Sequence, residues 1–157
     1  MNTQKHTAFF ENTRLLNENF GIIPLMYGSL GLEYLTKQDL NSDDVDILIP
    51  KQFVTSRFGE LKAFLEQKGY TLIDEREHTF LKDGLCYSYA QIEELETFAH
   101  ITISEIKTER VGEVSFKMLS LEQYLKVYTA SEKDGYRINT RGKKDAEKIA
   151  FIKNLLK

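Results

Sequence analysis

The sequence predicts an α+β fold in which a mixed β-sheet is flanked by helices and followed by C-terminal helices. Strand-like apolar segments are interleaved with segments whose apolar residues recur every three or four positions. The turn signal Lys82-Asp83-Gly84 separates two strand-like segments and indicates a β-hairpin. We expect a core over residues 1–118, and a helical segment over residues 119–157 that packs on it as a single compact unit.

Two helices are predicted to cover one side of the sheet. The first spans residues 7–20 and is stopped by Gly21, and the second spans residues 53–68 and ends before Gly69. A short apolar strand is expected before Gly28, and a second strand begins at Asp44.

The later elements are predicted from alternation, turn residues and capping patterns. Further strands are expected over residues 70–74, 77–81, 85–90 and 97–106. Ser120-Leu121-Glu122-Gln123 has the form of a capping box and opens a helix to about residue 131. A last helix is expected over residues 143–156, with this inner apolar stripe: Ala146, Ile149, Ile152 and Leu156.

The most informative pattern is the carboxylate pair in the strand-like run Asp44-Val45-Asp46-Ile47-Leu48-Ile49. Residues two apart on a strand point to the same face, so Asp44 and Asp46 lie together there. Neighbouring like charges repel unless a cation lies between them. The pair therefore indicates a metal site, although the alternative of a solvated strand end remains open.

A phosphate site is indicated upstream, where an apolar strand turns into a helix at Gly28-Ser29. Gly28 permits the sharp turn and leaves room for a ligand, and Ser29 is expected to cap the helix. The N–H groups at a helix start favour an anion such as phosphate. Phosphate beside metal describes a nucleotide site.

Gly28-Ser29, a helix, and then Asp44-x-Asp46 on a strand resemble the nucleotidyltransferase superfamily, to which DNA polymerase beta belongs. Fourteen residues lie between Ser29 and Asp44. The run from Gly31 to Ile47 is particularly similar to lincosamide and aminoglycoside 2″-type nucleotidyltransferases. A weaker similarity, to the helix that follows the core in this superfamily, covers residues 141–149 and includes Lys144.

The resemblance implies a specific reaction. A nucleoside triphosphate would lie on Gly28 and Ser29, with Mg²⁺ or Mn²⁺ held by Asp44 and Asp46, and Lys144 would contact the nucleotide. A hydroxyl of a small molecule or protein would attack the α-phosphorus and release pyrophosphate. The cations would neutralise the attacking and departing oxygens.

The resemblance also implies a third carboxylate on a later strand. No Asp lies inside the expected strand over residues 97–106. Glu96 is the candidate third acid, and His100 is a candidate base because its ordinary pKa allows proton transfer near neutral pH. The alternatives are that Glu96 is a solvated turn residue and that His100 is a hydrogen-bonded strand histidine.

Composition limits the partners. A net charge of −3 over 157 residues disfavours binding to long nucleic acid. The only cysteine, Cys86, excludes an internal disulfide, and the N-terminus has no apolar signal core. No apolar run is long enough for a membrane span, so we expect a cytoplasmic protein.

Three candidate functions are compatible with these patterns. The first is a nucleotidyltransferase, and the second is a non-catalytic nucleotidyltransferase-like module that binds a nucleotide or partner without turnover. The third is a metal-dependent phosphoesterase, which is disfavoured because no His/Asp cluster builds a second metal site. The sequence leaves open the acceptor, the base and the oligomeric state.

Overall fold

A computed structural model describes residues 3–133 and 135–157, with side chains described over residues 4–133 and 145–157. The chain divides into two compact units. The first comprises Met1–Ile92 and Lys107–Met118, and the second comprises Glu93–Ile106 and Leu119–Lys157. How a C-terminal segment beginning at residue 119 packs on the core stays a prediction.

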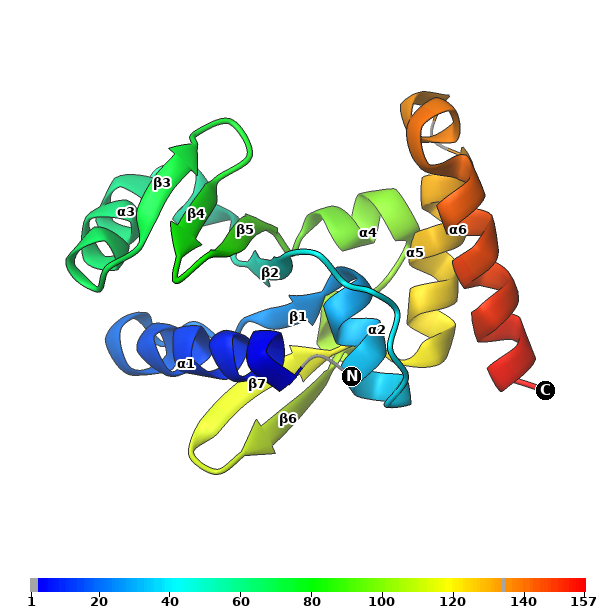
Figure 1. The fold of residues 1–157 in the computed structure, drawn as a ribbon, viewed down its shortest axis with the longest axis horizontal. Coiled ribbons are helices and arrows are strands. Elements are labelled where there is room, and N and C mark those ends of the chain that lie inside the picture. Colours follow the sequence, from blue (N-terminus) through cyan, green and yellow to red (C-terminus); the bar gives the residue numbers. More distant parts are fainter. Residues whose placement is uncertain (1–2, 134) are drawn as a thin grey trace. The chain divides into compact units, whose positions relative to one another are not determined.

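The first unit is built on a seven-stranded mixed sheet with the order β3-β4-β5-β2-β1-β7-β6 (Figure 1). Two strand pairs are parallel, β2 with β5 and β1 with β7, and the other neighbours are antiparallel. The strands are β1 (Leu25–Tyr27), β2 (Val45–Ile49), β3 (Thr71–Asp74), β4 (Thr79–Lys82), β5 (Leu85–Gln91), β6 (Lys107–Val111) and β7 (Val114–Met118). The predicted α+β fold with a mixed sheet is confirmed.

Helices of the first unit follow the sequence signals with shifted boundaries. Its helical segments are α1 (Thr3–Phe20), α2 (Gly28–Thr36), the 3-10 segment η1 (Lys51–Val54) and α3 (Phe58–Gln67). Gly21 ends α1 with φ of 66°, as its position predicts. The helix expected over residues 53–68 was wrong at its start, because a 3-10 turn precedes α3.

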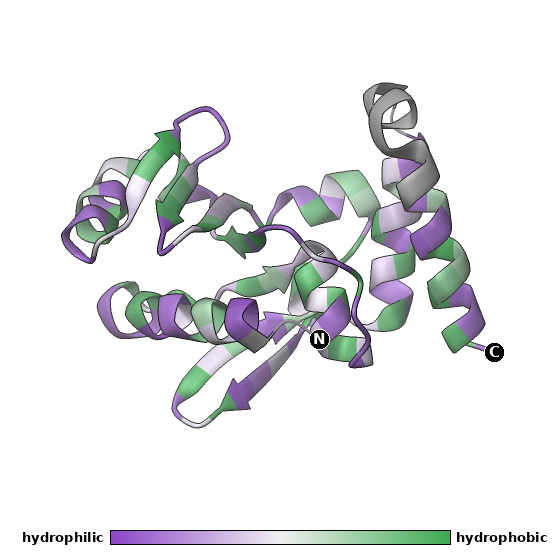
Figure 2. Ribbon diagram, viewed as in Figure 1, coloured by the Kyte–Doolittle hydropathy of each residue, from purple (hydrophilic) through white to green (hydrophobic). Residues whose placement is uncertain are grey.

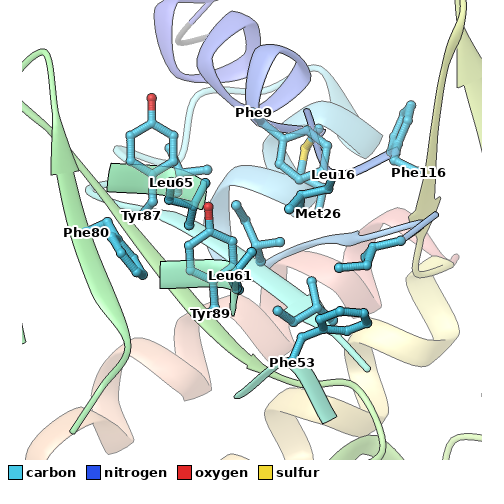
Figure 3. Packing of buried hydrophobic residues seen from close by; sticks show 14 of the residues in the cluster. Phe9, Leu16, Met26, Phe53, Leu61, Leu65, Phe80, Tyr87, Tyr89 and Phe116 are labelled. Carbon is cyan, nitrogen blue, oxygen red and sulfur yellow. The ribbon is translucent and has the colours of Figure 1, made fainter. Parts of the chain in front are cut away.

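The core lies between one face of the sheet and the helices α1 and α3. Val45, Ile47 and Ile49 alternate into this core, as the strand pattern predicts. The helices supply Phe9 and Leu16 from α1 and Leu61 and Leu65 from α3 (Figure 3). Tyr87 and Tyr89 of β5 enter the same cluster, and burial raises the pKa of both phenols.

The three hairpins of the sheet turn through residues with positive φ. The connection from β3 to β4 ends at His78, where φ is 51°. The predicted β4–β5 hairpin is confirmed, with φ of 52° at Asp83 and 79° at Gly84. A third hairpin, which the sequence pattern did not reveal, joins β6 to β7 at Gly112, where φ is 61°. The edge strand β6 is largely hydrophilic (Figure 2), which protects its unpaired edge from association.

The strand expected over residues 97–106 was wrong. This segment instead contains the end of helix α4 (Glu94–Ala99) and the 3-10 turn η2 (Ile103–Glu105). Leu95 and Ala99 are buried four residues apart, which is a helical period, and His100 ends the helix with φ of 56°. In so short a segment the apparent alternation was a coincidence of spacing.

The second unit also contains α5 (Leu121–Lys133) and α6 (Gly135–Leu155). The predicted capping box is confirmed, because Ser120 Oγ accepts from Gln123 N at 3.1 Å and Gln123 Oε1 accepts from Ser120 N at 2.9 Å. The inner stripe expected on the last helix was partly wrong. Ile152 is buried, whereas Ala146 and Leu156 are exposed.

Among the described residues, no helix combines the length and the apolar character needed to cross a bilayer.

Candidate nucleotide site

The turn between β1 and α2 places Gly28 at the start of the helix. Its φ of 65° lies in the left-handed region that favours glycine. The helix N-cap is Tyr27, which has extended backbone and makes no side-chain capping bond. The expectation that Ser29 caps the helix was therefore wrong, because the left-handed Gly28 lets α2 begin earlier and Ser29 lies in its first turn.

Asp46 lies directly against this turn. In the antiparallel pairing of β1 with β2, Tyr27 is opposite Asp46. A Cβ atom added to Gly28 would lie 2.6 Å from Asp46 Oδ2. Only a residue without a side chain fits here, so the glycine brings the first turn of α2 against the carboxylate.

The two candidate metal ligands differ in exposure. Asp46 is half-buried within β2, whereas Asp44 is exposed in the bend that precedes the strand. Carboxylates at these positions supply the hard oxygen donors that Mg²⁺ prefers.

Strand β5, which pairs with β2, carries no carboxylate. In the parallel pairing of β2 with β5, Asp46 is opposite Ser88, and paired residues point to the same face. The Ser88 hydroxyl lies 2.9 Å from Thr79 Oγ1 of β4. A hydroxyl therefore occupies the β5 position nearest to Asp46 in register.

The predicted third acid and base belong to the second unit and are exposed. Glu96 Oε1 accepts a hydrogen bond from Ile103 N at 3.3 Å, which ties α4 to the turn that follows it. His100 is the residue that ends α4. The strand on which both roles were based is absent there, and the roles themselves stay predictions.

The side chain of Lys144 lies outside the described residues, so its nucleotide contact stays a prediction. Its neighbour Asp145 is buried, and Asp145 Oδ2 accepts a hydrogen bond from Ser131 Oγ at 2.7 Å. This bond joins α6 to α5 and gives Asp145 a structural role.

Comparison with known proteins gives one informative relative and one informative structure. No family model matches the chain. The chain is 34% identical over 152 residues to uncharacterized protein YnaI of Bacillus subtilis (strain 168), and the alignment covers 97% of each protein. The chain belongs to the YnaI family.

The fold of this YnaI-family protein is similar to the solution structure of the antibiotic-resistance factor ANT(2″)-Ia. The TM-score is 0.53 at 16% sequence identity, and the match covers 99% of this chain and 92% of that one. The similarity confirms the nucleotidyltransferase fold predicted from Gly28-Ser29 and the Asp pair. At this identity it establishes the fold alone.

The donor set of the YnaI-family protein fits one Mg²⁺ more readily than two. Mg²⁺ is commonly held by one or two carboxylates together with substrate phosphates and water. Asp46 supplies one such carboxylate beside the helix start that favours phosphate, and Asp44, two residues before it in the chain, is the candidate for the second. No cluster of three or more Asp, Glu, His or Cys suited to a metal occurs within the described part of the chain.

Two residues of this region were missed by sequence reasoning. Ser88 lies on a strand that was predicted, but its place opposite Asp46 depends on sheet order. Glu33 lies on the predicted helix and is fully buried. The charged residue on the apolar side of a helix was the only signal that could have drawn attention to it.

Proposed function

We propose that this protein binds a nucleoside triphosphate with Mg²⁺ or Mn²⁺ and transfers the nucleoside monophosphate to a hydroxyl group of a small molecule or protein. The contact between Gly28 and the Asp46 carboxylate on a nucleotidyltransferase fold is the observation that supports this function. It places an anion-binding helix start beside a metal ligand.

Each residue of the proposed site has a distinct task. Gly28 and Ser29 supply the first turn of α2, which would hold phosphate oxygens. Asp44 and Asp46 would hold the metal ion, which neutralises charge on the phosphates during transfer. The acceptor oxygen forms a bond to the α-phosphorus, the bond to the bridging oxygen breaks, and pyrophosphate leaves. The acceptor proton passes to a base, for which Glu96 and His100 remain the candidates.

Isothermal calorimetry with ATP, GTP, CTP and UTP tests the nucleotide site. We expect at least one triphosphate to bind in the presence of Mg²⁺, and binding to be lost when EDTA removes the metal. Pyrophosphate release with a panel of hydroxyl acceptors, aminoglycosides included because of the ANT(2″)-Ia similarity, then tests transfer. Metal-independent binding, or no binding to any of the four, would contradict the proposal.

A second candidate function is a nucleotide-binding module without turnover. It is favoured by Ser88, because a hydroxyl stands where β5 comes closest in register to Asp46. This candidate predicts metal-dependent nucleotide binding with no pyrophosphate release from any acceptor. It would leave Glu96 and His100 without a catalytic task.

Substituting Ser88→Asp tests whether this β5 position faces the metal site. A second carboxylate beside Asp46 is expected to lower the melting temperature in EDTA, because the two charges repel. Adding Mn²⁺ is expected to restore the melting temperature of this variant. The variant is also expected to bind Mn²⁺ more tightly than the wild type does. Ser115→Asp, on β7, is the matched control and should show no such metal dependence.

A further inference from the structure

The loop that leads to the Asp pair is fastened by a buried acid on α2. Glu33 is fully buried, and its Oε2 accepts hydrogen bonds from Leu40 N at 2.7 Å and Ser42 N at 3.3 Å. Its Oε1 accepts from Ser42 Oγ at 2.9 Å. One carboxylate therefore ties three donors of the segment 37–44, which we call the acidic loop.

Burial of a carboxylate has an energetic cost that hydrogen bonds offset only partly. An apolar residue of similar size would fill the same space on α2 without that cost. The bonds that Glu33 makes all go to the acidic loop, so the gain from this acid is a defined loop conformation.

The acidic loop also has a backbone that needs such support. Lys37 and Asn41 adopt φ of 61° and 54°, although neither is glycine. Asp39 Oδ1 accepts from Asn41 N at 2.8 Å, and this bond lowers the pKa of the Asp39 carboxyl. Left-handed residues persist where the surroundings determine the conformation, and they concentrate at functional sites.

A second element holds the same point of the loop. Lys5 of α1 donates from Nζ to the carbonyl oxygen of Ser42. Ser42 is thus bound through its backbone N–H, its carbonyl and its hydroxyl, two residues before Asp44.

We propose that Glu33 is a positioning residue that places Asp44 and Asp46 for metal binding, which rests on the function proposed above. Gly28 and Glu33 lie on one helix, and Glu33 holds the loop that ends at Asp44. A helix is rigid over this length, so α2 connects the phosphate end of the site to its metal end. Glu33 acts through its bonds to Ser42.

Mn²⁺ binding, followed by water-proton relaxation, tests this role in the intact protein. Glu33→Gln places an NH₂ group against the donors of the acidic loop, and its Mn²⁺ affinity is expected to fall about tenfold or more, as for other residues that orient metal ligands. Ser42→Ala removes the hydroxyl bond but keeps the backbone bond, and a smaller loss is expected. Amide hydrogen exchange of residues 40–46 should become faster in both variants.

Two controls separate positioning from stability. Glu66→Gln makes the same chemical change on an exposed pair with Lys62, and Mn²⁺ affinity should not change. Leu65→Ala destabilises the core on α3 and should lower the melting temperature without lowering Mn²⁺ affinity.

The outcomes are distinguishable. Wild-type binding with Glu33→Gln affinity within twofold of it would overturn the role of Glu33 while leaving the proposed function intact. A wild type that binds no Mn²⁺, alone or with ATP, would overturn the proposed function and the metal-site role together. Unchanged amide exchange in Glu33→Gln would show that Glu33 does not hold the loop.

Discussion

Replacing Gly28 by alanine is expected to weaken metal-dependent nucleotide binding about a hundredfold, because a Cβ atom there would meet Asp46 Oδ2 at 2.6 Å. The carboxylate would have to move away from the first turn of α2, which separates the proposed metal ligand from the phosphate position. A left-handed φ adds strain of about 1 kcal/mol for any residue with a side chain. Calorimetry with Mg²⁺ and the triphosphate that the wild type binds measures the loss.

Gly112→Ala is the matched control for this substitution. Gly112 has nearly the same φ, 61° against 65° at Gly28, but an added Cβ would meet nothing within 4 Å. Both variants therefore carry the same backbone strain, and only Gly28→Ala creates the clash with Asp46. Equal nucleotide affinity in the two variants would show that the close approach has no part in binding.

Asp46→Asn is expected to reduce Mg²⁺-dependent nucleotide binding by about a hundredfold, or roughly 2.7 kcal/mol. The amide has nearly the same shape but lacks the charge that a hard cation requires. Titration of the triphosphate at fixed Mg²⁺ measures the loss, and thermal unfolding in parallel checks that the variant is folded.

Asp43→Asn serves as the control for charge. Asp43 is exposed and precedes Asp44, so the substitution removes the same charge from the same segment. Nucleotide affinity should then change little, because surface charges are screened by salt. A loss as large as that of Asp46→Asn would mean that net charge, and not ligation at Asp46, controls binding.

Much of the local structure could be predicted from sequence because it depends on neighbouring residues. The alternation of Val45, Ile47 and Ile49 set the buried face of β2, and Asp83-Gly84 set the hairpin turn. Gly21 and the Ser120 capping box marked helix ends for similarly local reasons. That the Gly28-Ser29 turn and the Asp pair belong to one nucleotide site was predicted from the residues and from a family resemblance, and the fold similarity supports that resemblance.

Predictions failed where a segment was short or where its environment decided its state. The apolar residues near 97–106 fit both the two-residue period of a strand and the period of a helix. The structure has the helical period, with Leu95 and Ala99 buried on one side of α4. Ser29 matched a capping residue, but the left-handed turn at Gly28 moved the helix start. The strand β6 was missed because an edge strand can be polar where it faces water, and its hairpin partner β7 was missed with it.

By itself, the sequence determined the α+β class, the buried face of the strand that carries Asp46 and the glycine turn that precedes it. These features follow from backbone periodicity and from the φ angles that each residue tolerates, which act over a few residues. Only the tertiary structure decided that Ser88 is opposite Asp46 and that Glu33 binds the acidic loop. Both contacts join segments separated along the chain, and their register is set by how the whole core packs rather than by either segment alone.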